Sequence, residues 1–301
     1  MDLLYKYKNG NYNVLIFDDG TKVRQTNESV WKPDFAENID IKLTDKCTGT
    51  NCTYCHEGSG PNGKNGDILN LKFFDTLHEG QEVALGGGNI FEHPDLLALL
   101  EKLKNKHIIC NITVNQLHFF KYLNLIKTLI KDKLVYGVGV SLTYPTQQLI
   151  DALKEPVFKN VVIHTINGIL TKEQVEKLKN NNLRLLILGY KHLRRGKNYF
   201  NKEKDLIEKN QKWLEDNILE LFSHFKVVSF DNLALEQLNM QDKLDKNIWE
   251  KCYMGDDGTT TFYIDCVNKQ FAQSSTSELD KRYPLFDNID DMFRVIVENK
   301  I

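Results

Sequence analysis

Short strand-like runs alternate with longer segments of helical spacing from about residue 38 to residue 231. Apolar residues between the runs recur every three or four positions, as at Leu123, Ile126 and Ile130, and indicate helices. Thr171 and Gln174 have the spacing of a capping box and predict a further helix. Strands connected through helices form parallel sheets, and six or more such units can close or partly close into a barrel. The pattern therefore predicts an α/β fold with strands at Ile39–Leu43, Glu82–Leu85, His107–Val114, Leu134–Leu142, Asn160–Ile166, Leu183–Leu188 and Lys226–Phe230.

Two hairpin patterns flank this alternating region. Residues Asn13–Gln25 contain two strand-like runs around an Asp-Gly dipeptide, which is typical of a tight turn between antiparallel strands. A second hairpin-like region, Thr259–Ala272, follows a helical segment near Leu238–Glu250 and precedes a helix around Ile289–Glu298. We therefore expect three parts: an N-terminal hairpin extension at 1–37, a partial barrel at 38–235 and a C-terminal cap at 236–301.

Charge and hydropathy exclude two broad classes of partner. Lys and Arg number 39 against 41 Asp and Glu, so the net charge of -2 argues against a generally basic surface for nucleic acid. No stretch approaches 18 uninterrupted apolar residues, and the first ten residues lack the apolar run of a signal peptide. We expect a cytoplasmic protein with no membrane partner.

Three of the six cysteines, Cys47, Cys52 and Cys55, fall within nine residues after the first predicted barrel strand. Thiols stay reduced in the cytoplasm, so such a cluster indicates metal binding rather than disulfides. Three thiolates could hold a 4Fe-4S cluster with one open iron, whereas a zinc site would need a fourth ligand such as His56. Spacing alone leaves both readings open. The glycine-rich segment His56–Asp67 then predicts a mobile loop that could act as a lid.

A second motif follows the second predicted strand, where the sequence reads Leu-Gly-Gly-Gly-Asn-Ile-Phe-Glu-His-Pro from Leu85 to Pro94. Glycines at a strand end let a backbone approach a ligand closely. Together with the cysteines, this motif resembles the radical S-adenosylmethionine (radical SAM) superfamily, and the resemblance runs from roughly residue 38 to residue 231. The superfamily usually has three residues in the first cysteine gap, whereas Thr48–Asn51 makes four here. It also commonly has Glu where Asn89 stands.

The resemblance implies a fold, two cofactors and a set of site residues. The fold would be a partial (β/α)6 barrel with functional groups at the carboxyl ends of its strands. Cys47, Cys52 and Cys55 would bind one 4Fe-4S cluster whose open iron holds S-adenosylmethionine. The remaining cofactor contacts would be Tyr54 near the adenine, Gly86, Gly87, Gly88 and Asn89 at the amino group, and Ser141, His164 and Lys191 at the carboxylate and ribose.

The resemblance also implies a reaction. One electron from a donor such as flavodoxin or ferredoxin would cleave S-adenosylmethionine, and the resulting 5′-deoxyadenosyl radical would abstract hydrogen from a substrate. A peptide or protein side chain is the expected substrate. The alternatives are a nucleotide or nucleic-acid base, favoured by six Lys and Arg residues in Lys191–Lys204, and a non-catalytic metal-binding protein. For the basic segment itself, a solvated loop is the competing reading.

The last two cysteines raise the question of a second cluster. The segment from Cys252 to Ala272 resembles the start of an auxiliary cluster, but a further cysteine expected after the hairpin is missing. Cys266 follows Phe262 and Ile264 at even spacing, which equally predicts an apolar packing position. We expect one cluster per chain, a hairpin that caps the barrel mouth, and Cys252 as a hydrogen-atom donor or substrate contact.

Overall fold

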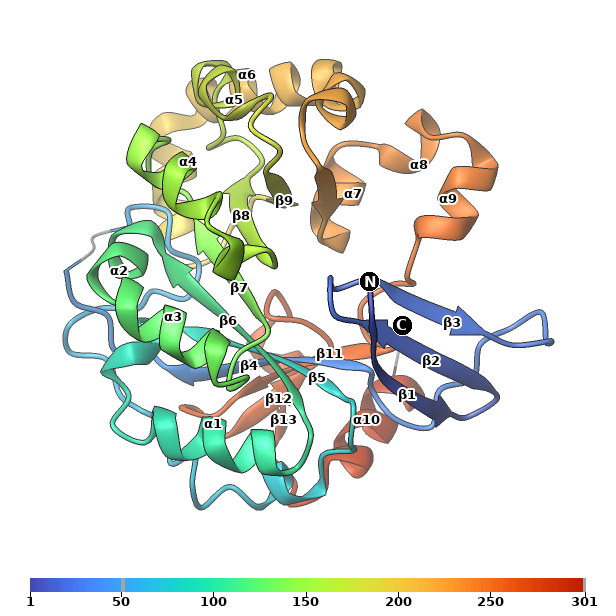
Figure 1. Ribbon diagram of the computed structural model, residues 1–301. Coiled ribbons are helices and arrows are strands. Elements are labelled where there is room, and N and C mark those ends of the chain that lie inside the picture. The colour runs from blue at the N-terminus through green and yellow to red at the C-terminus, as the bar shows by residue number, and fades with distance from the viewer. Residues whose placement is uncertain (50–51, 300–301) are drawn as a thin grey trace.

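The computed structural model describes residues 1–49 and 52–299, and a ten-stranded sheet lies at the centre of that part (Figure 1). Its order is β10-β9-β8-β7-β6-β5-β4-β11-β12-β13. The seven strands from β10 to β4 are parallel neighbours, and each coincides with a predicted strand. They are β4 (Asn38–Thr44), β5 (Glu82–Gly87), β6 (Ile109–Asn115), β7 (Gly137–Ser141), β8 (Val161–Ile166), β9 (Arg184–Leu188) and β10 (Val227–Phe230).

Helices connect and cover these strands (Figure 1). The predicted capping box is present at the start of α5, where Thr171 and Gln174 each bond the other's backbone N–H. The basic segment 191–204 is mostly helical instead of a loop, because α6 begins at Arg195, but Lys197, Lys202 and Lys204 are exposed as a solvated segment would be. The α-helices are α1 (Leu96–Asn105), α2 (Gln116–Lys121), α3 (Leu123–Lys131), α4 (Gln147–Leu153), α5 (Lys172–Leu178), α6 (Arg195–His224), α7 (Asn232–Gln237), α8 (Met240–Lys243), α9 (Lys246–Cys252) and α10 (Ile289–Glu298). Short 3-10 turns are η1 (Lys72–Thr76), η2 (Ile90–Glu92), η3 (Pro156–Phe158) and η4 (Leu279–Lys281).

Alternation along the parallel strands separates the core from the site. On β4, the side chains of Ile39, Ile41 and Leu43 are buried in the main apolar core. Asp40 and Lys42 belong to the opposite face, because successive residues of a strand point to opposite sides. Both of these polar residues line a cavity instead.

The N-terminal extension is a three-stranded antiparallel sheet of β1 (Leu3–Asn9), β2 (Tyr12–Phe17) and β3 (Lys22–Gln25). The predicted hairpin is confirmed as β2 and β3, whereas β1 was not predicted. The turn between β2 and β3 bonds the amino-terminal side of the barrel strands: Lys159 Nζ lies 2.6 Å from Asp18 Oδ2, and Arg184 Nη1 donates to the Asp19 carbonyl at 2.9 Å. This extension therefore lies against the segments that begin β8 and β9, and its turn lines part of the cavity described below.

The C-terminal hairpin consists of β11 (Thr261–Asp265) and β12 (Gln270–Ala272), followed by the short β13 (Tyr283–Pro284). We expect this hairpin to cap the barrel mouth; its strand β11 pairs with β4 in parallel and continues the main sheet, and Tyr263 and Ser275 of this region line the cavity described below. Phe262, Ile264 and Cys266 are buried in the main core, so Cys266 has the packing role that its even spacing allowed. Among the described helices, none has the length and apolar character needed to cross a membrane.

Candidate functional site

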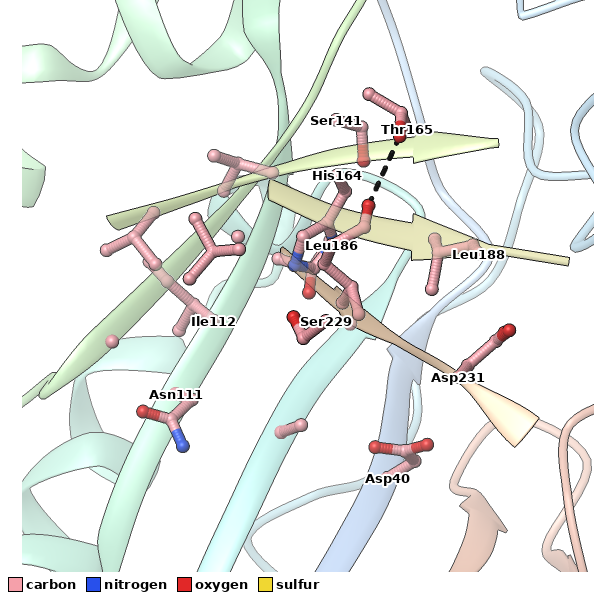
Figure 2. Close-up of a pocket in the computed structure, with 18 of the residues that line it drawn as sticks. Asp40, Asn111, Ile112, Ser141, His164, Thr165, Leu186, Leu188, Ser229 and Asp231 are labelled. Carbon is pink, nitrogen blue, oxygen red and sulfur yellow. Dashed lines mark hydrogen bonds between the residues drawn. The ribbon is translucent and has the colours of Figure 1, made fainter. Parts of the chain in front are cut away.

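A cavity of about 870 Å³ extends along the parallel strands, from the loops at their carboxyl ends to residues near their amino ends. Every strand from β4 to β10 contributes to its wall, and several of these contributions are drawn in Figure 2. Ten of the twelve residues predicted for the site line it, namely Cys47, Cys52, Tyr54, Cys55, Gly86, Gly87, Gly88, Ser141, His164 and Lys191. Asn89 and Cys252 do not.

The loop after β4 brings the three cysteines to this cavity. The Cys47 N–H donates to the Gly60 carbonyl at 2.9 Å, and the Cys55 N–H donates to the Cys52 carbonyl at 3.2 Å. Asn115, the last residue of β6, donates through Nδ2 to Cys52 Sγ at 3.7 Å. Residues 50 and 51 of the unusual first gap lie outside the described residues. Over the ranges 1–49 and 52–299, no three His, Cys, Asp or Glu side chains are grouped to hold a single metal ion.

Tyr54 stands between the second and third cysteines. Its ring meets that of Tyr199 edge-on at 5.8 Å between centroids. Burial, followed by the charge of Cys52, raises the pKa of Tyr54 to about 12. The phenol is therefore neutral at physiological pH and presents a ring beside the cysteines.

The glycine triplet has a structural role in addition to the expected cofactor contact. Gly87 has a φ of +118°, and a Cβ there would lie 2.4 Å from the Thr44 carbonyl oxygen. A Cβ on Gly88 would lie 2.1 Å from the Lys46 oxygen, so both glycines allow the end of β5 to touch the segment that leads to the cysteines. A Cβ on Gly86, by contrast, would meet nothing within 4 Å. Gly86 is thus the member of the triplet that leaves space in the cavity.

Asn89 supports the cysteine loop instead of lining the cavity. It is buried, and its Nδ2 donates to Glu92 Oε1 at 2.8 Å. The same Glu92 oxygen accepts from the Thr48 N–H at 3.0 Å and from Thr48 Oγ1 at 2.6 Å. His118 Nε2 lies 2.7 Å from the Thr48 carbonyl oxygen. Asn89 therefore acts through Glu92 on the residue that follows Cys47, because its amide is used in this local network.

The other predicted side chains lie at different depths along the cavity or outside it. Ser141 ends β7 and is the register partner of His164 on β8. The His164 ring lies over Gly139, where a Cβ would approach it to 2.1 Å, so the ring extends deeper into the barrel than Ser141. Lys191 follows β9, and its Nζ donates to Ser275 Oγ at 3.0 Å. Cys252 is exposed at the end of α9, away from the cavity wall.

A buried ion network holds both ends of the cysteine segment. Lys42 Nζ lies 2.6 Å from Asp45 Oδ1, 3.0 Å from Glu57 Oε2 and 3.2 Å from Asp265 Oδ2. Burial alone would lower the pKa of Lys42, but these carboxylates, Glu57 foremost, raise it above its ordinary value. Asp45 precedes Cys47 by two residues and Glu57 follows Cys55 by two, so one ammonium group fixes the entry and the exit of the loop.

The glycine-rich segment after the cysteines is bonded along its length to the rest of the site. The Asp45 N–H donates to the Lys64 carbonyl at 2.8 Å, and the Gly66 N–H donates to the Leu43 carbonyl at 2.9 Å. Arg195 Nη2 donates to the Ser59 carbonyl at 2.8 Å. These contacts tie the segment to the β4 loop and to α6, which argues against the expected lid.

Sequence reasoning missed four polar residues around the site: Asp40, Lys42, Glu57 and Asn115. Asp40 and Lys42 sit in a strand whose alternation of apolar and polar residues signalled an exposed polar face. Curvature of the sheet turns that face into the cavity wall. Asn115 could have been found, because it ends a predicted strand on the same side as the cysteines.

Comparison with known proteins gives a fold. No protein-family model and no curated protein matches this chain. A structure of Streptococcus suis SuiB is 13% identical and covers 99% of this chain and 88% of its own, with a TM-score of 0.58. The alignment with S. suis SuiB bound to S-adenosylmethionine covers 89% of this chain and 67% of SuiB, at 15% identity and a TM-score of 0.56. The alignment with S. suis SuiB bound to the precursor peptide SuiA covers 80% of this chain and 60% of SuiB, at 16% identity and a TM-score of 0.50. The chain therefore has the fold of SuiB, an α/β fold in which seven parallel strands surround a cavity.

Proposed function

We propose that this protein is a radical SAM enzyme that binds one 4Fe-4S cluster and S-adenosylmethionine in the cavity and acts on a peptide. One observation carries the proposal: Cys47, Cys52 and Cys55 follow β4 and line a cavity at the carboxyl ends of parallel strands. The fold is shared with SuiB, and a SuiB structure holds S-adenosylmethionine. The two motifs that resemble the superfamily meet here, since β4 and β5 are neighbours.

The residues present fit both groups. Thiolates are the soft ligands that iron–sulfur clusters require, and three of them leave one iron open. A single structural zinc ion would need a fourth protein ligand in addition to the three cysteines. The open space at Gly86 admits a second molecule beside the cysteines. When bound and reduced by one electron, the pair supplies a 5′-deoxyadenosyl radical that abstracts hydrogen from a substrate.

The chain's own residues would position these groups. Tyr54 offers an apolar ring to an adenine, and Gly86 lets an amino group approach the backbone. Ser141 and Lys191 supply a hydroxyl and an ammonium for a ribose and a carboxylate. Lys42 and Glu92 act as positioning residues, because Lys42 holds the segments before and after the cysteines and Glu92 holds the residue that follows Cys47.

A peptide is the substrate class that the comparisons support best, since SuiB has been solved with its precursor peptide bound. The basic segment gives the nucleotide alternative less support than its composition suggests, because two of its six cations are engaged within the protein. Arg194 Nη1 lies 3.1 Å from Glu57 Oε2, and Arg195 donates to the Ser59 carbonyl. Reduction requires an external electron donor, for which flavodoxin or ferredoxin is the natural class.

Anaerobic reconstitution with iron and sulfide tests the proposal directly. We expect about four irons per chain, and reduction with dithionite in the presence of S-adenosylmethionine should release 5′-deoxyadenosine. Cys55→Ala should lose both signals, while Cys252→Ala, which alters an exposed thiol outside the cavity, is the matched control. Binding of zinc in place of iron, or iron binding without any 5′-deoxyadenosine, would favour a non-catalytic metal-binding protein. About eight irons per chain would show a second cluster.

A further inference from the structure

The space between the parallel strands, on the amino-terminal side of the cysteines, is not filled by large side chains. Barrels of parallel strands ordinarily pack large branched side chains inside. Here the inward positions of β5 and β7 carry Ala84, Gly86, Gly137 and Gly139, all of which line the cavity. Small residues at these positions leave a chamber, which Asp40 on β4 and His164 on β8 enter from different sides (Figure 2).

Asp40 and His164 have no hydrogen-bond or ion-pair partner for their side chains among residues 1–49 and 52–299. Both side chains line the open cavity, so their polar atoms are available to a ligand that enters it. Asp40 is surrounded by protein yet open to the space of the cavity, and burial raises its pKa to about 6. Burial lowers the pKa of His164 to about 4. At neutral pH the chamber thus holds a carboxylate and a neutral imidazole.

Negatively charged groups outnumber positively charged groups around Asp40. Asp231, just after β10, stands on the facing side of the chamber in Figure 2, and Asp257 adds a further negative charge. Asp231 Oδ1 accepts from the Gly189 and Ala234 N–H groups, which leaves its charge uncompensated by a cation. Lys191 is the cation that acts on Asp40, and its Nζ is bonded to Ser275. One ammonium group therefore faces three carboxyl groups.

We propose that this chamber is the substrate subsite and that Asp40 receives a protonated amine or a guanidinium of the substrate. The inference rests on the function proposed above and names the chemistry of the group that enters. A carboxylate that lines a cavity and has no ion-pair partner forms its strongest hydrogen bonds with a cationic donor. A divalent metal ion fits less well, because hard cations need six or more oxygen ligands and the described residues form no such group.

Short probes on the reconstituted enzyme test this without knowledge of the natural substrate. N-acetyl-Gly-Lys-Gly-amide should bind at least about tenfold more tightly than its norleucine isostere by calorimetry, since the two differ by one charged donor. Asp40→Asn should abolish that preference and Asp40→Glu should keep most of it. Asp287→Asn, which alters an exposed carboxylate, is the control and should bind both peptides like the wild type.

Further binding measurements show whether the cationic group belongs to a peptide or to a small free amine. They also separate this inference from the proposed function. Tighter binding of n-butylamine than of the lysine peptide would assign the subsite to a small free amine; the reverse order would assign it to a peptide side chain. The inference fails if wild type binds the lysine and norleucine peptides equally, binds neither at millimolar concentration, or keeps its preference in Asp40→Asn. The proposed function fails instead if wild type forms no 5′-deoxyadenosine, whatever the peptides do.

Discussion

Replacing Lys42 with Met should destabilise the protein and loosen the cysteine loop. Lys42 is 2% exposed, and its three partners Asp265, Glu57 and Asp45 are 0%, 10% and 27% exposed. Removing one side of a buried ion pair costs about 3–5 kcal/mol, because the remaining charge is left uncompensated. Arg282 Nη1 lies 4.0 Å from Asp265 and Asp45 is partly hydrated, so we expect the lower end, about 3 kcal/mol.

Urea unfolding followed by circular dichroism measures this loss. Lys72→Met is the matched control, because Lys72 and Asp287 form a pair in which each side chain is 73% exposed, and it should cost about 0.5 kcal/mol or less. The Lys42 variant should also retain less iron after reconstitution, since Asp45 and Glu57 flank the cysteines. A loss of stability below about 1 kcal/mol would refute the reasoning that this ammonium group holds the network together.

Three further predictions follow from single contacts. The thermal unfolding midpoint of Cys55→Ala should lie within a few degrees of that of Cys252→Ala, whereas Cys55→Ala alone should lose iron. The reason is that the Cys55 thiol lines the cavity and does not belong to the core; a collapse of the fold would contradict this. Gly88→Ala should destabilise the protein far more than Gly60→Ala in urea, since a Cβ at 88 would meet a carbonyl oxygen at 2.1 Å and one at 60 would meet nothing within 4 Å; equal effects would refute the close approach. The pKa of Asp40 is raised by burial from 3.8 to about 6, so its contribution to stability is full below pH 4 and is lost as pH rises through 6. Asp40→Asn should therefore gain stability over wild type between pH 4.5 and pH 7.5 in urea titrations, and an unchanged difference would show that the carboxyl is not perturbed.

Much of the fold follows from local signals that the sequence carries by itself. The seven parallel strands were predicted because short apolar runs of β-forming residues are separated by helical spacing, a pattern that depends on neighbours within a few positions. The start of α5 is equally local, because Thr171 and Gln174 satisfy backbone groups of the same turn. The cysteines also reach the cavity by a local rule, since loops after parallel strands gather at one edge of the sheet.

Only the tertiary structure determines the contacts of the polar site residues and the position of the C-terminal hairpin in the sheet. β11 pairs with β4 across more than two hundred residues, so the hairpin's place in the sheet depends on which edge was left open, not on its own pattern. The sequence predicts Asn89 as a cofactor contact, whereas its bond to Glu92, which in turn holds Thr48, is visible only in the tertiary structure. The sequence predicts Asp40 as a polar residue on one face of a strand, and only the tertiary structure shows that this face lines a cavity whose wall also contains glycines. Alternation of residues specifies the two faces of a strand, whereas curvature and the side chains of distant strands determine whether a polar face meets bulk water, a partner or an empty space.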